Sequence, residues 1–344
     1  MKLDPQEIKK IAIFRALQLG DLLCAIPAVR ALRYAYPQAH ITLLSMPWAQ
    51  ILVDRFPQYF NAFVHFPGYP GLPEQSVSPK AFTAFLTAMQ ETEFDLVLQM
   101  QGNGTIVNPM VELLGGKYTA GFCIPNDYCP NKNLFLEYPN GIHETERHIR
   151  LMEYLGIPTQ GTDLEFPITQ KDEYELTQLQ LPIEPQRYVC VHPGSRGGWR
   201  QWPVAYFAKL ADDAADKGFK IVLTGTKEEM DIVQSVVQHM THSGIVVAGK
   251  TTMGAVAVLI KQAFALISNC TGVSHIAAAL HTPSVVISMD GEPERWAPLN
   301  TQLHHTIDWI RTPQFERAQE ALESLISRFA QRNHFRDAQV SLIK

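Results

Sequence analysis

Short apolar runs alternate along the chain with longer stretches in which apolar residues recur at helical spacing. In the N-terminal half we predict strands over residues 10–15, 40–45 and 94–100, with a helix over 22–36 between the first two. In the C-terminal half we predict a helix over 203–217 and strands over 187–192, 219–224, 245–248, 264–268 and 284–288. Two successive sets of alternating strands and helices predict an α/β protein with two doubly wound halves.

We expect the two halves to join within residues 156–186, where repeated glycines and prolines interrupt regular structure. The length of 344 residues also exceeds one ordinary core and suggests two domains. Ligands of open parallel sheets bind outside the carboxyl ends of the strands. Two such domains facing each other would therefore enclose a central cleft lined by both sets of loops.

Composition narrows the class of protein. Hydrophobic residues make up 46% and charged residues 18% of the chain, no apolar run of about 18 residues occurs, and the first ten residues lack an export signal. We therefore expect a cytoplasmic protein with no transmembrane segment. A net charge of −5 without a dense basic cluster argues against nucleic acid as a partner. Five scattered cysteines predict neither a disulfide framework nor a zinc site.

The most informative stretch is residues 267–280, where an apolar strand breaks at Thr271-Gly272 and a small-residue helix follows at once. The first turn of a helix has backbone N–H groups without intrahelical acceptors and the positive end of the macrodipole. A phosphate outside Thr271 to Ser274 would be held there without a metal. The alternative is a capped, buried helix with no ligand.

Two pattern matches in the sequence are misleading. Residues 244–251 fit the phosphate-loop expression G-x-x-x-x-G-K-T, but the four middle residues look like a strand rather than a loop that follows one. Residues 102–107 resemble a dinucleotide fingerprint, but the third glycine is missing and Asn108-Pro109 should interrupt a helix there. We expect this second segment to be a tight turn, either close to a substrate or without a ligand.

Three separated motifs then carry a family resemblance. They are residues 17–32, LQLGDLLCAIPAVRAL; residues 192–195, HPGS, with RQWP at 200–203; and residues 268–279, SNCTGVSHIAAA, with Arg295-Trp296. Together they resemble glycosyltransferase family nine, the ADP-heptose:lipopolysaccharide heptosyltransferases and their relatives. The resemblance implies a GT-B fold, with an acceptor-binding domain over 1–165 and a nucleotide-sugar donor domain over 186–314. It also implies that the C-terminal helix, over 315–344, packs back on the first domain.

The resemblance implies an inverting sugar transfer with Asp21 as the catalytic base. From local sequence, capping of the following helix is an equally good role for Asp21. The chain has no Asp-x-Asp, so we expect helix N-termini and a cation to hold the leaving diphosphate, with no cofactor and no metal. The predicted donor-binding residues are Ser195, Arg200, Glu228, Thr251, Thr271, Gly272, Val273 and His275, with Glu229 an equal alternative to Glu228. The predicted acceptor-binding residues are Gly20, Asn103 and His143.

Departures from the family pattern bear on the substrates. Cys270 stands where most members have an aspartate near the donor sugar, so the sugar could differ from heptose. The expected donor is nevertheless ADP-heptose, and the expected acceptor is a lipopolysaccharide core or another surface glycan or glycolipid at the inner membrane surface. Scattered cations could form a local basic face but are more often only solvated; they are Arg15, Arg30, Arg33, Lys80, Lys117, His143, Arg147 and His148. The alternatives are a transferase for a non-heptose sugar and a non-catalytic nucleotide-sugar binding protein.

Overall fold

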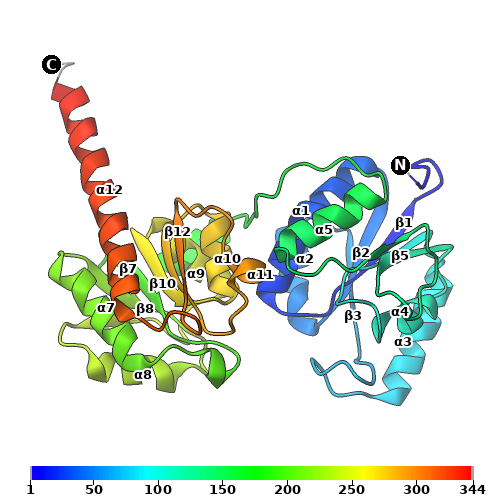
Figure 1. Ribbon diagram of the computed structural model, residues 1–344, viewed down its shortest axis with the longest axis horizontal. Coiled ribbons are helices and arrows are strands. Elements are labelled where there is room, and N and C mark those ends of the chain that lie inside the picture. The colour runs from blue at the N-terminus through cyan, green and yellow to red at the C-terminus, as the bar shows by residue number, and fades with distance from the viewer. Residues whose placement is uncertain (1, 342–344) are drawn as a thin grey trace. The chain divides into compact units, whose positions relative to one another are not determined.

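The computed structural model describes the backbone of residues 2–341 and the side chains of residues 2–328. The chain divides after Pro167 into two compact units (Figure 1). The division lies inside the segment 156–186, which is rich in glycine and proline. In this part of the chain no helix is long and apolar enough to span a membrane.

The first unit is a six-stranded parallel sheet with strand order β3-β2-β1-β4-β5-β6. Its elements are β1 (Lys10–Phe14), α1 (Leu19–Ala35), β2 (His40–Ser45), η1 (Pro47–Ala49), α2 (Gln50–Arg55), β3 (Ala62–His65), α3 (Pro79–Thr92), β4 (Leu96–Gln99), α4 (Val107–Glu112), β5 (Tyr118–Cys123), β6 (Phe135–Glu137) and α5 (Glu144–Tyr154). Helices α1 and α5 run side by side against the sheet (Figure 1).

The second unit repeats this topology with strand order β12-β11-β10-β7-β8-β9, again all parallel. Its elements are α6 (Gln170–Thr177), β7 (Tyr188–His192), η2 (Gly198–Arg200), α7 (Val204–Asp216), β8 (Lys220–Leu223), α8 (Met230–His239), β9 (Gly244–Val246), α9 (Met253–Gln262), β10 (Ala265–Asn269), α10 (Gly272–Ala279), β11 (Ser284–Ser288), α11 (Pro293–Trp296), β12 (His304–Asp308) and α12 (Phe315–Ser341).

Both sheets have their topological switch point at equivalent strands. In the first unit the strand order reverses between β1 and β4, and in the second between β7 and β10. The loops that leave these strand pairs at their carboxyl ends form the crevice in which doubly wound sheets bind ligands. The prediction of two doubly wound α/β domains is confirmed.

Each unit has its own apolar core, because strands of a parallel sheet are covered on both faces. Phe14, Leu44 and Val97 of the first sheet pack against Met110 and Val111 of α4. In the second unit the apolar residues of β7 and β10 pack against α7, and the start of α12 adds Phe315, Ala318, Leu322 and Leu325 to that core. Packing of the predicted C-terminal helix onto the first domain stays a prediction, and its last residues, 342–344, lie outside the described residues.

Two local expectations were wrong. Helix α1 begins at Leu19, whereas we predicted a start at Leu22. Asn108-Pro109 does not interrupt a helix but lies in the first turn of α4. Proline is tolerated there because the first N–H groups of a helix have no intrahelical acceptor.

Candidate functional site

The switch point of the first unit is held together by polar bonds between the loops after β1 and β4. The backbone N–H of Ala16 donates to Oε1 of Gln101 over 2.7 Å. The guanidinium of Arg15, which is fully buried, donates from Nη1 to the carbonyl of Met100 and from Nε to the carbonyl of Asp21. These bonds fix the position of the first turn of α1 relative to both strands.

Asp21 is the third residue of α1 and not its N-cap, which is Gln18. Its Oδ2 accepts a hydrogen bond of 3.2 Å from the Gln18 N–H, as an acidic residue at this position does in a capping box. Its Oδ1 lies 3.7 Å from Nη2 of Arg15, and the side chain is 20% exposed. The alternative of Asp21 as the N-cap was therefore wrong in position, although the carboxylate does contribute to capping, and part of Asp21 reaches solvent.

Next to Asp21 lies a buried charged cluster that consists of Arg15, Glu144, Arg147 and His148. Glu144 is 3% exposed and lies 3.0 Å from Arg15 Nη2 and 3.4 Å from His148 Nε2, and it also accepts from Arg147 Nη1. Burial and the neighbouring guanidinium of Arg15 lower the pKa of His148 to about 4, so its ring is neutral at pH 7. The expectation that Arg15, Arg147 and His148 are solvated surface groups was wrong, because all three are buried and Glu144 pairs with both guanidinium groups inside the fold.

The predicted acceptor residues lie in three different segments of this unit. Gly20 is buried in the first turn of α1. Asn103 is exposed in the turn after β4, where its Oδ1 accepts from the Thr105 N–H over 3.1 Å. His143 is the N-cap of α5, and its Nδ1 accepts from the Thr145 N–H over 3.1 Å. His143 was also expected to be solvated, but it is only 6% exposed.

The turn after β4 is built around two glycines in the left-handed region, Gly102 with φ +61° and Gly104 with φ +94°. A Cβ on Gly104 would lie 2.3 Å from the Phe122 carbonyl oxygen and 2.3 Å from Asn108 Nδ2. The Asn108 amide itself donates to the Phe122 carbonyl over 2.9 Å. The glycines therefore serve a tight turn next to β5 instead of a dinucleotide fingerprint that opens directly into a helix.

In the second unit, the side chain of Asn269 organises the switch point. Asn269 ends β10 and is fully buried. Its Nδ2 donates to the carbonyls of Pro193 (2.8 Å) and Gly194 (3.2 Å), and its Oδ1 accepts from the Trp202 N–H over 2.9 Å. One amide thus joins the loop after β7 to the start of α10. We did not predict this role, because an asparagine at the end of an apolar run gives no pattern of its own.

Helix α10 begins directly after Asn269 and Cys270, with Thr271 as its N-cap. The hydroxyl of Thr271 makes no capping bond to the helix. Gly272, Val273 and His275 form the first turn together with Ser274, and the buried ring of His275 lies edge-on to Trp296 with the centroids 6.4 Å apart. The strand, turn and helix of the predicted anion site are confirmed as secondary structure.

Arg200 lies in the same group of loops and has a buried anionic partner. Its Nη2 lies 2.8 Å from Oδ2 of Asp290, whose side chain is 4% exposed. Its Nε is buried with no hydrogen-bond partner among the described residues. Asp290 follows β11, and its position two residues after an apolar strand was the signal that sequence reasoning overlooked.

Ser195 and Cys270 complete the edge of this crevice. Ser195 is 8% exposed in the loop after β7. The thiol of Cys270 is buried and lies 3.5 Å from the Trp296 carbonyl. Burial raises the pKa of Cys270 to about 12, with a smaller contribution from the Asp290 charge. Cys270 is therefore a neutral thiol at pH 7 and does not replace the charge of an aspartate.

The structure separates the two glutamates that sequence left as alternatives. Glu228 is exposed, whereas Glu229 is partly buried and turns toward β7. The Glu229 carboxylate accepts from the Thr226 N–H over 2.8 Å and lies 3.7 Å from His192 Nε2. Burial lowers the pKa of His192. Thr251 follows β9, two strands away from β7, and its buried hydroxyl has no partner among the described residues.

Residues 244–251 do not form a phosphate loop. Strand β9 covers Gly244–Val246, where we predicted a strand over 245–248, and Lys250 Nζ donates back to the Val246 carbonyl over 3.2 Å. Two histidines of this unit also have protein partners. His242 Nε2 lies 2.7 Å from Asp216, and His304 Nδ1 is 2.8 Å from the Ser284 hydroxyl.

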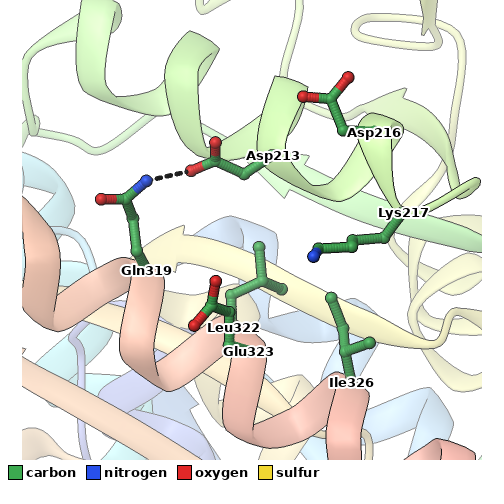
Figure 2. Close-up of a pocket in the computed structure, with 7 residues that line it drawn as sticks. All are labelled: Asp213, Asp216, Lys217, Gln319, Leu322, Glu323 and Ile326. Carbon is green, nitrogen blue, oxygen red and sulfur yellow. Dashed lines mark hydrogen bonds between the residues drawn. The ribbon is translucent and has the colours of Figure 1, made fainter.

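The second unit also has two cavities that contain none of the predicted site residues. One, of about 200 Å³, lies between α7 and α12, where Gln319 donates to Asp213 over 2.7 Å (Figure 2). It is lined by Asp213, Asp216, Lys217, Gln319, Leu322, Glu323 and Ile326. The other, of about 420 Å³, lies beside β12 and α12. Neither is at the carboxyl ends of β7 and β10.

Comparisons with known proteins identify the family. The model of glycosyltransferase family 9 (heptosyltransferase) matches residues 82–325. Lipooligosaccharide heptosyltransferase 2 of Haemophilus ducreyi is 26% identical over 322 residues, which cover 85% of this chain and 87% of that protein.

Solved structures agree with the fold. A family 9 glycosyltransferase from Veillonella parvula has a TM-score of 0.75 at 20% identity, covering 93% of this chain and 90% of its own. The Escherichia coli ADP-heptose lipopolysaccharide heptosyltransferase II has a TM-score of 0.72 at 20% identity, covering 94% and 100%. The predicted GT-B type of fold, with two Rossmann-like domains, is confirmed. Because the family model matches well over half of the chain, the protein belongs to glycosyltransferase family 9.

Proposed function

We propose that the protein transfers heptose from ADP-heptose to a lipopolysaccharide core, with inversion at the anomeric carbon and without a metal ion. The observation that carries the proposal is the complementary chemistry of the two switch points. One has a partly exposed carboxylate, Asp21, and the other has a helix N-terminus beside a guanidinium. The names of the relatives, which are lipooligosaccharide and ADP-heptose lipopolysaccharide heptosyltransferases, supply the substrate class.

In the proposed donor site the diphosphate lies against the first turn of α10. The N–H groups of Gly272 and Val273 and the hydroxyls of Thr271 and Ser195 would donate to its oxygens. Arg200 would donate from Nε, which has no protein partner in the described chain, while Asp290 keeps the guanidinium in place. His275 would support this turn from within the helix.

The nucleoside would extend from the diphosphate toward β8 and β9. The Glu229 side chain points toward β7, whereas Glu228 is exposed. Glu229 is therefore the better acceptor for the ribose hydroxyls. The buried hydroxyl of Thr251, which has no partner among the described residues, would face the adenine base of the donor. This assignment follows the strand order, because β8 and β9 are the next strands after β7 at that edge.

The proposed reaction is a single displacement. Asp21 accepts the proton of the acceptor hydroxyl, whose oxygen attacks the anomeric carbon as the bond from that carbon to the diphosphate oxygen breaks. The negative charge that develops on the leaving ADP meets the amides of α10 and the Arg200 guanidinium. Attack opposite the leaving group inverts the anomeric carbon.

We further propose that the acceptor is a glycolipid reached at the inner membrane surface from the cytoplasm. Gly20 and Asn103 would lie against it. His143 would lie near it as the N-cap of α5, with its Nδ1 held by the Thr145 N–H. A second candidate donor, a non-heptose nucleotide sugar, is favoured by the neutral Cys270 thiol beside the anion site.

The experiment that tests the proposal is an assay of ADP release with a lipopolysaccharide core acceptor. ADP-heptose should be turned over in the presence of a chelator, and NMR of the product should show the anomeric configuration opposite to that of the donor. Faster turnover of another nucleotide sugar would replace the donor assignment. Binding without turnover of any donor would indicate a non-catalytic nucleotide-sugar binding protein.

A further inference from the structure

Glu144 is a buried carboxylate that the proposed reaction does not use. It is the first residue of α5, and one of its oxygens, Oε1, lies 3.0 Å from Arg15 Nη2 and 3.4 Å from His148 Nε2. The other oxygen accepts from Arg147 Nη1. With 3% of the residue exposed, Glu144 must be stabilised by these partners, because an unpaired buried carboxylate is strongly disfavoured.

Arg15 connects Glu144 to Asp21. Its Nη2 faces both carboxylates, at 3.0 Å from Glu144 and 3.7 Å from Asp21 Oδ1. Its Nε donates to the Asp21 backbone carbonyl over 2.8 Å, and its Nη1 donates to the Met100 carbonyl. The guanidinium is thus fixed on three sides, and the closer of its two carboxylate partners is Glu144.

The charges of this region balance. Arg15 and Arg147 carry two positive charges, and Asp21 and Glu144 carry two negative ones. The other titratable groups that face them are His148, which burial keeps neutral, the thiol of Cys24 on α1, which burial keeps protonated, the N-cap His143, and Tyr138, whose ring stacks on the Arg147 guanidinium. Loss of the Glu144 charge would leave both guanidinium groups with Asp21 as their nearest remaining anion among these groups.

We propose that Glu144 is a positioning residue for the base: it holds Arg15 beside Asp21 and neutralises the guanidinium, so that Asp21 stays basic and oriented toward the acceptor. This inference rests on the proposed role of Asp21. Without Glu144, Arg15 would form a closer ion pair with Asp21, which stabilises the charged carboxylate and weakens it as a proton acceptor.

Glu144→Gln tests the proposal, because glutamine has the same shape but no charge. We expect kcat to fall roughly tenfold or more and the acidic limb of the pH–rate profile to move to lower pH, with the Kd for ADP unchanged. Glu144→Asp, which restores the charge, should recover most of kcat and the wild-type limb. A purely structural role for Glu144 would lower the amount of folded enzyme without moving the limb.

The matched control is Glu165→Gln. Like Glu144, Glu165 pairs with an arginine of the same unit, here Arg30 of α1, and it accepts from the Tyr59 hydroxyl over 2.8 Å, but its ion-pair partner is not Arg15. This variant should have wild-type kcat and a wild-type pH profile.

If Glu144→Gln does not fold, Arg15→Lys provides the second test. Lysine keeps the charge but lacks the planar guanidinium that reaches both carboxylates. Arg15→Lys should therefore lower kcat and leave the Kd for ADP unchanged.

Asp21→Asn is measured in parallel to separate the two proposals. Wild-type kcat in Asp21→Asn would contradict the proposed function itself, whatever the Glu144 variants do. Loss of kcat in Asp21→Asn, together with wild-type kcat and an unmoved limb in Glu144→Gln, would overturn only the role of Glu144. If Glu144→Gln does not fold, wild-type kcat in Arg15→Lys would likewise overturn the role of Glu144.

Discussion

Asp21 shows how two roles can meet in one side chain. One oxygen accepts the Gln18 N–H and so fixes the start of α1, while the other faces Arg15. Sequence alone left capping and catalysis as equal alternatives, and the geometry is compatible with both at once. The sequence could not predict the start of α1 at Leu19, because a glutamine N-cap followed by leucine and glycine is not a typical helix start.

Among single residues, the buried charged cluster around Glu144 differs most from the prediction. Arg147 and His148 lie one helical turn after Glu144 in α5, but Arg15 is 129 residues away from Glu144 in the sequence, and no pattern indicates that it shares a buried site with them. Burial of charge depends on long-range neighbours, which a single sequence does not specify. The position of Asp290 two residues after an apolar strand was a usable signal, but its pairing with Arg200 is a long-range contact of this kind.

The buried neutral His148 predicts a loss of stability in acid. Its pKa of about 4 in the fold is below the unfolded value of about 6.5, so between these values the unfolded chain binds more protons. The stabilisation is complete above pH 6.5 and is lost as the pH falls toward 4. When the pH falls from 7.5 to 5, we expect the free energy of unfolding to decrease by about 2 kcal/mol because of His148.

Urea unfolding of the wild type and of His148→Gln at the two pH values measures this effect. The variant should be less stable at pH 7.5 but should lose less stability on acidification. An equal loss in both proteins would show that other groups, such as His192 and His304, cause the acid sensitivity.

Arg200 predicts an effect on donor binding. Arg200→Ala removes a charged hydrogen-bond donor from the proposed diphosphate site, so the Kd for ADP should rise roughly 10- to 100-fold. Titration calorimetry with ADP checks this. Because the change leaves Asp290 without its partner, the Arg200→Ala/Asp290→Asn double variant should be measured as well.

Arg311→Ala is the matched control in the same unit. Arg311 is 66% exposed and pairs with Glu294 over 2.8 Å. Its removal should leave the Kd for ADP unchanged. If the Arg200 variants also bind ADP with wild-type affinity, the proposed diphosphate site is wrong.

At the scale of elements, the strands were the most predictable part of the fold. Strands buried on both faces have continuous apolar runs, so β2 and β11 were predicted with the right bounds and β1, β4, β7, β8, β9 and β10 within two residues. Strands β3, β5, β6 and β12, which lie toward the edges of the two sheets, were not predicted. Loop positions were less predictable, because one residue decides which way a side chain points. Glu228 and Glu229 are the example, and only the structure shows that Glu229 turns toward β7.

The turn after β4 predicts different effects for its two glycines. Gly104→Ala should lower the free energy of unfolding by at least about 2 kcal/mol, because its Cβ would overlap the Phe122 carbonyl in addition to the cost of a positive φ. Gly102→Ala has the same sign of φ but no atom within 4 Å of the new Cβ, so it should cost only about 1 kcal/mol. Urea unfolding compares them, and equal losses would contradict the close packing of this turn.

At the scale of the whole molecule, the two units repeat one topology with different chemistry. Alternation of strands and helices predicted two doubly wound domains, and the family motifs directed attention to the loops after β1, β7 and β10. The sequence could not predict which polar residues join those loops, such as Gln101 and Asn269, because their partners are main-chain groups of distant segments.

The central claim is that the first unit provides the base and the second binds the donor. The most direct test is to measure kcat and the Kd for ADP-heptose of Asp21→Asn, since asparagine keeps the shape of the side chain but does not accept a proton at neutral pH. We expect kcat to fall at least roughly a hundredfold while Kd stays at the wild-type value. Wild-type kcat, or a Kd that rises as much as kcat falls, would contradict it.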